Sequence, residues 1–337
     1  MPSITAPPLT AGLTTIATPA LWAIAIGILA LLLALDFVLT RRPHDVAMRE
    51  AVGWSVFYLV LPLVFGFYLW AAFGATPAVE FFTGYVVEKS LSVDNLFVFM
   101  LLLSAFAVPE ALARRVLLYG IIGALVLRAI FIALGATALR SGTWVFLLFG
   151  AILLVTAAKV LKGAIGGREK ELDVSSMRSV RLIKRLVPVT EDYHGSRLFV
   201  RRDGALALTP LALAAAAVFA TDIVFAVDSV PAVYGVTEDP FLVFATNAFA
   251  LLGLRALYFV LQGVLTRLRH LDHGLSVILG FIGVKLILHW AHGIWPGVPE
   301  IPTLASLGVI IAVLVTVTIT SLRAERRDGR PADLPGR

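Results

Sequence analysis

The sequence predicts an all-α membrane protein that crosses the bilayer about nine times. Hydrophobic residues make up 59% of the 337 residues and charged residues only 15%, a balance that does not suit the polar surface of a water-soluble domain. Nine runs are apolar over the roughly 20 residues that a membrane-spanning helix needs. The basic residues collect in alternate connections between these runs, as they do in polytopic membrane proteins.

The nine predicted spans are joined by short connections, except for one long loop. They cover about residues 21–40, 52–73, 80–106, 113–139, 143–161, 205–236, 241–261, 274–290 and 303–322. The first span is expected to be an uncleaved anchor, because no Lys or Arg precedes it and a secretory signal peptide has a basic start. The N-terminus is therefore predicted to lie outside the cell and the C-terminus in the cytoplasm.

Positive charges support this orientation. Of the 28 Lys and Arg residues, 23 fall in segments that the orientation places inside, and only Arg140 falls in an outer segment. Cytoplasmic loops of membrane proteins are enriched in Lys and Arg in this way. One missed or extra span would mix the two groups, so the charge distribution also favours the count of nine.

The chain is predicted to form a single transporter domain with two related halves. Repeat one covers about residues 80–162, a cytoplasmic loop 163–204, and repeat two 205–292, with peripheral spans at 21–40, 52–73 and 303–322 and a disordered tail at 323–337. Within the loop, Val180–Val187 could form a short basic amphipathic helix. Such a helix is expected to rest on anionic lipid at the cytoplasmic face, although a regulatory or partner-binding element is the alternative.

Two pairs of acids lie inside apolar runs. In each pair the second acid follows the first by six residues: Glu88 and Asp94 in the third span, Asp222 and Asp228 in the sixth. A charged side chain at the bilayer centre costs at least ~2.5–3.5 kcal/mol on insertion scales, so such residues usually serve a function. Each second acid is followed by a small polar residue, Asn95 or Ser229.

The similarity between the halves extends beyond the acids. Arg128 in the fourth span corresponds to Arg255 in the seventh, and Lys159 near the end of the fifth corresponds to Lys285 in the eighth. Corresponding spans are three apart and therefore run in opposite directions, which predicts a three-plus-three inverted repeat. Transporters built in this way bind their substrate near the bilayer midplane, often at an interrupted helix.

Helical geometry leaves two interpretations of each acid pair. Residues six apart differ by about 120° around a regular helix, so the two acids of a pair would not share a face. We expect partial unwinding between them, helped by Pro231 and Gly84. If the helices are instead regular, each acid has a separate role, and Glu88 shares a face with Asn95 as Asp222 does with Ser229.

This pattern predicts a cation site with oxygen ligands. The predicted ligands are Glu88, Asp94, Asn95, Asp222, Asp228 and Ser229, with Asp36, Thr221 and Asn247 as further candidates. Oxygen ligands suit Mg²⁺, Mn²⁺ and Ca²⁺, and a chain without cysteine offers no thiolate site. Four buried cations are expected to balance the site: Arg128, Lys159, Arg255 and Lys285. The competing interpretation is that these acids and bases form ion pairs that only hold helices together.

The same residues resemble the TerC family of integral membrane proteins, which is similar to the LysE-type exporters. The resemblance runs from about Leu33 to Leu322, and its most specific parts are Glu88–Asn95, Pro188–Gly195, Thr221–Pro231 and Asp239–Phe259, with a weaker match at His44–Ala51. It implies export of Mn²⁺ across a bacterial inner membrane. It also implies links to alkaline pH response, metal supply to secreted enzymes and tellurite resistance. An acid-lined site repels an oxyanion, so the tellurite phenotype is expected to be indirect.

The function expected from the sequence is a secondary transporter that exports Mn²⁺, with Ca²⁺ as the alternative ion, in exchange for protons. No prosthetic group, nucleic-acid partner or enzymatic activity is expected. The sequence contains no Gly-Lys-Ser/Thr phosphate-binding loop, and no Gly-x-Gly-Asp or His-Glu-x-x-His signature of an intramembrane hydrolase. The alternative is a scaffold that assists other membrane proteins through the 163–204 loop. Deleting that loop and neutralising the acids would separate the two functions.

Overall fold

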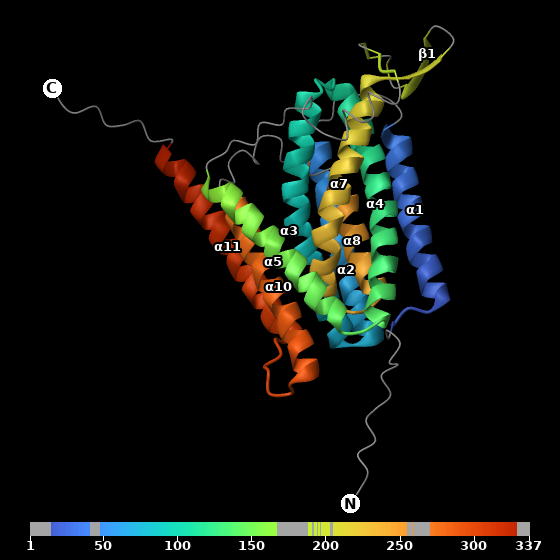
Figure 1. Ribbon diagram of the computed structural model, residues 1–337. Helices are drawn as coiled ribbons and strands as arrows, with labels where there is room; N and C mark the ends of the chain where they lie inside the picture. The colour runs from blue at the N-terminus through green and yellow to red at the C-terminus, as the bar shows by residue number, and fades with distance from the viewer. Residues whose placement is uncertain are drawn as a thin grey trace, which may run out of the picture.

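The structure is a computed structural model that describes residues 15–40, 48–166, 188–190, 192–193, 195, 197–202, 205–254, 258 and 270–328. This part of the chain forms nine helices and one β-hairpin (Figure 1). In chain order they are α1 (Pro19–Thr40), α2 (Met48–Phe73), α3 (Ala75–Ala105), α4 (Glu110–Arg140), α5 (Trp144–Ile165), β1 (Phe199–Arg202), β2 (Ala205–Leu208), α7 (Pro210–Tyr234), α8 (Pro240–Leu252), α10 (Leu271–Ile294) and α11 (Thr303–Asp328).

Each described helix coincides with one predicted span, which confirms a helical protein with many spans. Six helices are long and apolar enough to cross a membrane: α2, α4, α5, α7, α10 and α11. The apolar helices at Pro19–Leu35 and Pro240–Leu252 are shorter. Helix α3 has 31 residues and is less apolar because it carries the charged residues Glu80, Glu88, Lys89 and Asp94. The orientation in the membrane and the inverted repeat stay predictions.

The sixth predicted span begins too early in the sequence. Ala205–Leu208 was expected to start this helix, but it forms β2, which pairs antiparallel with β1. Thr209 and Pro210 explain the boundary, because the Thr209 hydroxyl accepts a hydrogen bond from Ala212 N at 3.3 Å and proline is favoured in a first helical turn. The long loop therefore ends in a hairpin. The amphipathic segment predicted at Val180–Val187 lies outside the described residues.

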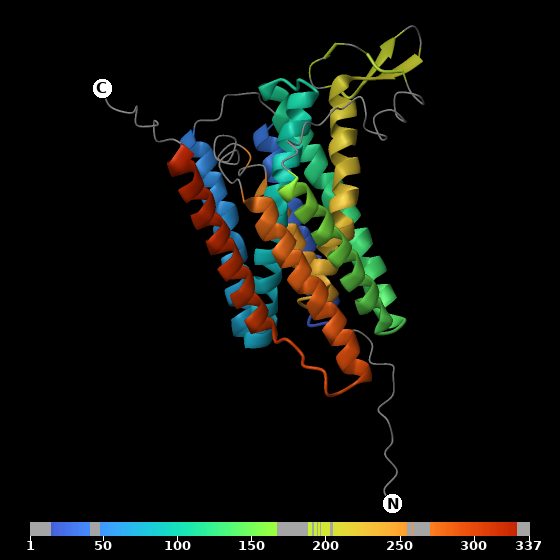
Figure 2. The ribbon, with the colours of Figure 1, turned by 60° about the vertical axis from the view of Figure 1, so that its left-hand side comes forward.

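Four helices form the centre of the bundle. Helix α4 packs along α7 and α3 packs along α8, while α5 packs along α10 beside this centre. Helices α2 and α11 contact α3, and α1 contacts α8. Both views show α5 and α10 running side by side (Figures 1 and 2). In the predicted repeat, α3 corresponds to α7 and α4 corresponds to α8. The contact between α4 and α7 therefore has its counterpart in the contact between α8 and α3, as such a repeat would require. The hairpin lies at one end of the bundle, and the α10–α11 connection lies at the other (Figure 1).

Small residues let α4 and α7 approach closely. A Cβ atom on Gly120 would lie 2.6 Å from Val218 Cγ1, and one on Gly123 would lie 2.6 Å from Phe219 Cδ2. Real Cβ atoms do not tolerate such distances, so the glycines are required for this packing. The close contact places Arg128, two turns along α4, beside the acids of α7.

We expect Gly120→Ala to lower the free energy of unfolding by about 1–3 kcal/mol, because an added methyl group overpacks the α4–α7 contact. Gly163→Ala is the matched control, since nothing lies within 4 Å of a Cβ at that position of α5. Thermal unfolding of both variants in detergent micelles tests the prediction. Equal unfolding midpoints for the two variants would contradict it.

Candidate cation site

A cluster of charged side chains is buried between α3, α4 and α7. Arg128 of α4 forms ion pairs with Glu88 of α3 and with Asp222 of α7, the latter at 3.6 Å between Nη2 and Oδ1. The side chains of Glu88 and Arg128 are 0% exposed and that of Asp222 is 1% exposed. Three charges with no access to solvent are costly unless they compensate one another, so this cluster is a defined structural feature.

Asn247 of α8 completes the cluster. Its Oδ1 accepts a hydrogen bond from Arg128 Nη1 at 2.6 Å, and its Nδ2 donates to Val243 O at 2.9 Å. The second bond fixes which side of the amide faces the guanidinium. The sequence suggested Asn247 only as a further ligand candidate, and the structure places it in direct contact with the buried arginine.

Neutral polar groups lie on the same helix faces as the acids. Ser92 and Asn95 follow Glu88 on α3 at intervals of four and three residues, and all three are buried; on α7, Asp222 and Ser229 are buried likewise. This is the face-sharing predicted for a regular helix. Several buried atoms here have no hydrogen-bond partner among the described residues: Glu88 Oε2, Asp222 Oδ2, Ser92 Oγ, Asn95 Nδ2 and Ser229 Oγ.

The predicted unwinding between the acids of each pair is wrong. Helix α3 is continuous from Ala75 to Ala105, and α7 is continuous from Pro210 to Tyr234. A continuous helix satisfies its own backbone groups, whereas unwound backbone at membrane depth needs other partners. Pro231 lies in the last turns of α7, beyond both acids, so it does not interrupt the helix between them. The interpretation that remains is that the two acids of a pair have separate roles.

Asp228 illustrates this separation. It lies on α7 six residues after Asp222 and is partly exposed, whereas Asp222 is buried. Thr221, beside Asp222, donates its hydroxyl proton to Ala217 O at 2.8 Å within α7. The two acids of α7 therefore lie in different surroundings, one buried and one partly exposed.

The other predicted residues are placed as follows. Lys159 is exposed on α5. Lys285 lines a different pocket, at the end of the bundle that carries the α10–α11 connection. The side chains of Asp36 and Asp94, and all of Arg255, lie outside the described residues. Of the four predicted supporting cations, the structure thus places only Arg128 in contact with the predicted acids, within the part that it describes.

The cluster offers oxygen ligands and carries excess negative charge. Glu88 and Asp222 contribute two negative charges against the single charge of Arg128, and their unpartnered oxygens could accept a cation. Carboxylate, amide and hydroxyl oxygens are the ligands that Mg²⁺, Mn²⁺ and Ca²⁺ prefer. No three Asp, Glu or His side chains stand ready as a metal site within the described ranges, and here Arg128 contacts both acids. A cation would therefore have to compete with the guanidinium.

Comparisons with known sequences identify the family to which the chain is similar. A family model described as "Integral membrane protein TerC family" matches residues 73–329. The "Putative membrane-bound redox modulator Alx" of Salmonella typhi is 40% identical over 326 residues, covering 93% of this chain and 98% of the relative. Its namesake from Escherichia coli strain K12 is 41% identical over 316 residues, or 90% and 95% of the two chains.

A further relative is the "Uncharacterized membrane protein STKORF319" of Myxococcus xanthus, which is 40% identical over 314 residues and covers 93% of this chain and 95% of its own length. No solved structure matches.

Proposed function

The chain belongs to the TerC family of integral membrane proteins, and from this premise we propose that it is a secondary transporter that exports a divalent cation from the cytoplasm. The preferred ion is Mn²⁺, and Ca²⁺ is the alternative. It is a multi-pass bacterial membrane protein. The observation that carries the proposal is the buried pair of carboxylates on α3 and α7 that both contact Arg128 and keep unpartnered oxygens.

In the proposed mechanism, Arg128 occupies the site when no ion is bound. Its guanidinium compensates Glu88 and Asp222, so that the empty carrier does not hold two uncompensated carboxylates in a low-dielectric interior. An arriving ion binds the carboxylate oxygens, and Asn95, Ser92 and Ser229 offer neutral oxygens on the same faces. Arg128 then moves away from the acids. Its return would help to expel the ion.

Exchange with protons follows from the same chemistry. A carboxylate that loses a cation in a low-dielectric site tends to take up a proton. Asp228 and the predicted ligand Asp94, the second acid of each pair, would carry such protons. Inward movement of protons would then drive outward movement of the ion, with no ATP site in the same chain.

The relatives' printed name suggests redox modulation instead. Residues 1–337 contain no cysteine, so thiol–disulfide exchange is not a reaction that they can perform. Metal supply to other proteins would link an ion exporter to redox effects indirectly. The scaffold function predicted as an alternative places its activity in the 163–204 loop, and most of that loop lies outside the described residues.

The first test is uptake of radiolabelled Mn²⁺ into proteoliposomes that contain the purified protein, with and without a pH gradient. We expect uptake to follow the gradient and to vanish in the Asp94→Asn/Asp228→Asn double variant, which keeps the shape of both side chains. Ca²⁺ is tested in parallel. Gradient-independent uptake, or normal uptake by a well-folded double variant, would contradict the proposal.

A further inference from the structure

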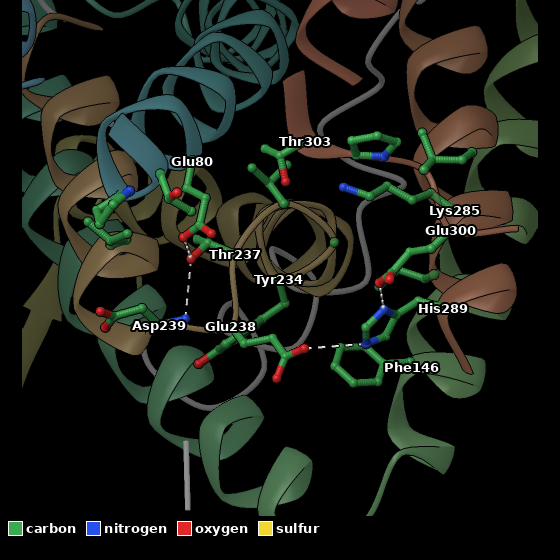
Figure 3. A pocket seen from close by; sticks show the side chains of 18 of the residues that line it. Glu80, Phe146, Tyr234, Thr237, Glu238, Asp239, Lys285, His289, Glu300 and Thr303 are labelled. Carbon is green, nitrogen blue, oxygen red and sulfur yellow. Dashed lines mark hydrogen bonds and ion pairs between the residues drawn. The ribbon is translucent and has the colours of Figure 1, made fainter. Parts of the chain in front are cut away.

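A second polar site lies at the end of the bundle that carries the α10–α11 connection. It is a cavity of about 670 Å³ between the start of α3, the α7–α8 connection, the end of α10 and the segment before α11 (Figure 3). Its charged lining residues are Glu80, Glu238, Asp239, Lys285, His289 and Glu300. None of them belongs to the cluster around Arg128.

His289 contacts two carboxylates at once. Its Nδ1 lies 2.6 Å from Glu300 Oε1, and its Nε2 lies 3.3 Å from Glu238 Oε1 (Figure 3). A neutral imidazole carries a single N–H, whereas the imidazolium carries two. Two ionised carboxylates can therefore both accept hydrogen bonds from His289 only when the ring is protonated.

The two contacts join different parts of the fold. Glu300 lies eleven residues from His289, in the connection that leaves α10. Glu238 belongs to the α7–α8 connection, whose neighbours are fixed elsewhere: Thr237 donates to Glu80 Oε2 at 2.7 Å, and Asp239 accepts from Thr15 Oγ1 at 2.8 Å. The Glu300 contact is thus local to α10, whereas the Glu238 contact joins α10 to the α7–α8 connection, which Thr237 in turn links to α3.

The distances determine which contact a deprotonated ring keeps. A ring with one N–H is expected to retain the shorter bond from Nδ1 to Glu300. Its Nε2 lone pair then faces the Glu238 carboxylate, which is repulsive. All three side chains are partly exposed, at 35% for His289, 50% for Glu238 and 49% for Glu300, so protons can exchange with water.

The surroundings of His289 hold few other charges. Lys285 and His292 share α10 with it, Glu80 projects from α3, and Asp239 follows Glu238 in the α7–α8 connection. Helix α5 contributes the uncharged ring of Phe146, whose centroid is 4.6 Å from that of His289. His292 uses Nδ1 for the backbone oxygen of Val298, at 2.6 Å. It needs one proton for that bond and contacts no carboxylate in the described structure.

We propose that Glu238, His289 and Glu300 form a proton-operated latch, which joins α10 to the α7–α8 connection when His289 is protonated and releases it when His289 loses its proton. Release frees the end of α10 and the α10–α11 connection to move away from the α7–α8 connection, while the rest of α10 stays packed on α5. The latch rests on these contacts and not on the identity of a transported ion, so it can hold or fail whether or not the protein carries Mn²⁺.

The test uses the absence of cysteine, because introduced cysteines are the only thiols in the chain. Ala75→Cys at the start of α3 and Gly297→Cys in the α10–α11 connection carry spin labels, and the distance between the labels is measured by pulsed electron paramagnetic resonance in lipid nanodiscs at pH 5.5 and pH 9. We expect a longer distance at pH 9. Between the two conditions, the ratio of the two populations should change by up to about tenfold per pH unit, because one proton is released.

Three variants in the same labelled protein separate the latch from general pH effects. His289→Arg should keep the short distance at both pH values, because its charge is permanent, and His289→Gln should give the long distance at both. His292→Gln, the matched control, should keep the wild-type pH dependence. A wild-type distance that ignores pH, or a pH dependence that survives in both His289 variants, would overturn the proposal.

Discussion

Arg128→Met is expected to lower the free energy of unfolding of the ion-free protein by about 3–5 kcal/mol, the usual cost of removing one partner from a buried ion pair. Glu88 and Asp222 would then share a buried site without a cation. Unfolding in detergent micelles, with chelator present, measures the effect. Arg140→Met is the control, since Arg140 is exposed at the end of the same helix and should change stability little.

The same variant tests whether Arg128 competes with the ion. Without the guanidinium, Mn²⁺ has no charge to displace, so it should stabilise Arg128→Met more than it stabilises the wild type. A ligand at a hundredfold excess over its dissociation constant contributes about 2.7 kcal/mol, which is enough to restore much of the loss. Combining Arg128→Met with Glu88→Gln and Asp222→Asn should restore stability without Mn²⁺. A single variant as stable as the wild type would show that Arg128 does not compensate the acids.

Asp222→Asn is expected to reduce Mn²⁺ transport strongly and leave the fold intact. Asparagine keeps the shape of the side chain, and Arg128 retains its ion pair with Glu88, so no buried charge is left without a partner. The site then offers one carboxylate fewer to a divalent ion. Transport in proteoliposomes should fall by roughly ten- to a hundredfold, because a contact to a charged group contributes about 1.5–3 kcal/mol and 1.4 kcal/mol of lost binding corresponds to a factor of ten.

Lys159→Gln serves as the control for this experiment. The two repeats suggested Lys159 as a supporting cation, yet it is exposed on α5, and its loss should not change transport. Purified Asp222→Asn should elute as the wild type does in size-exclusion chromatography. Transport at the wild-type rate by this variant would remove Asp222 from the site.

Composition predicted the helices well, because long apolar runs follow directly from the properties of a bilayer. The start of α7 was harder to predict. The residues of β2 are as apolar as those of a span, and what makes them a strand is their pairing with β1, which ends at Arg202, just before them. Hydropathy alone carries no information about such pairing.

The residues of the candidate site could likewise be predicted only in part. The unusual position of Glu88 and Asp222 in apolar runs identified both acids, and the choice of Arg128 as a supporting cation agrees with its contacts. The sequence could not rank Lys159 and Lys285 below Arg128, because the repeat pattern gives the helix on which a residue lies but not the direction of its side chain. The His289 contacts were missed for another reason: Glu238 and Glu300 lie in connections, where acids are common and carry no signal.

The complete burial of Arg128 has a consequence for how the protein is made. A ribosome delivers α3 before α4, so Glu88 is already in the membrane when Arg128 arrives, and the two helices can leave the translocon with this ion pair formed. Asp222 reaches the membrane only with α7, much later in synthesis. Until then Arg128 has only one of its two acidic partners, Glu88. We therefore expect the order of synthesis to matter: Arg128 is already in place beside Glu88 when Asp222 enters the membrane, so the buried acid of α7 meets a cation on arrival.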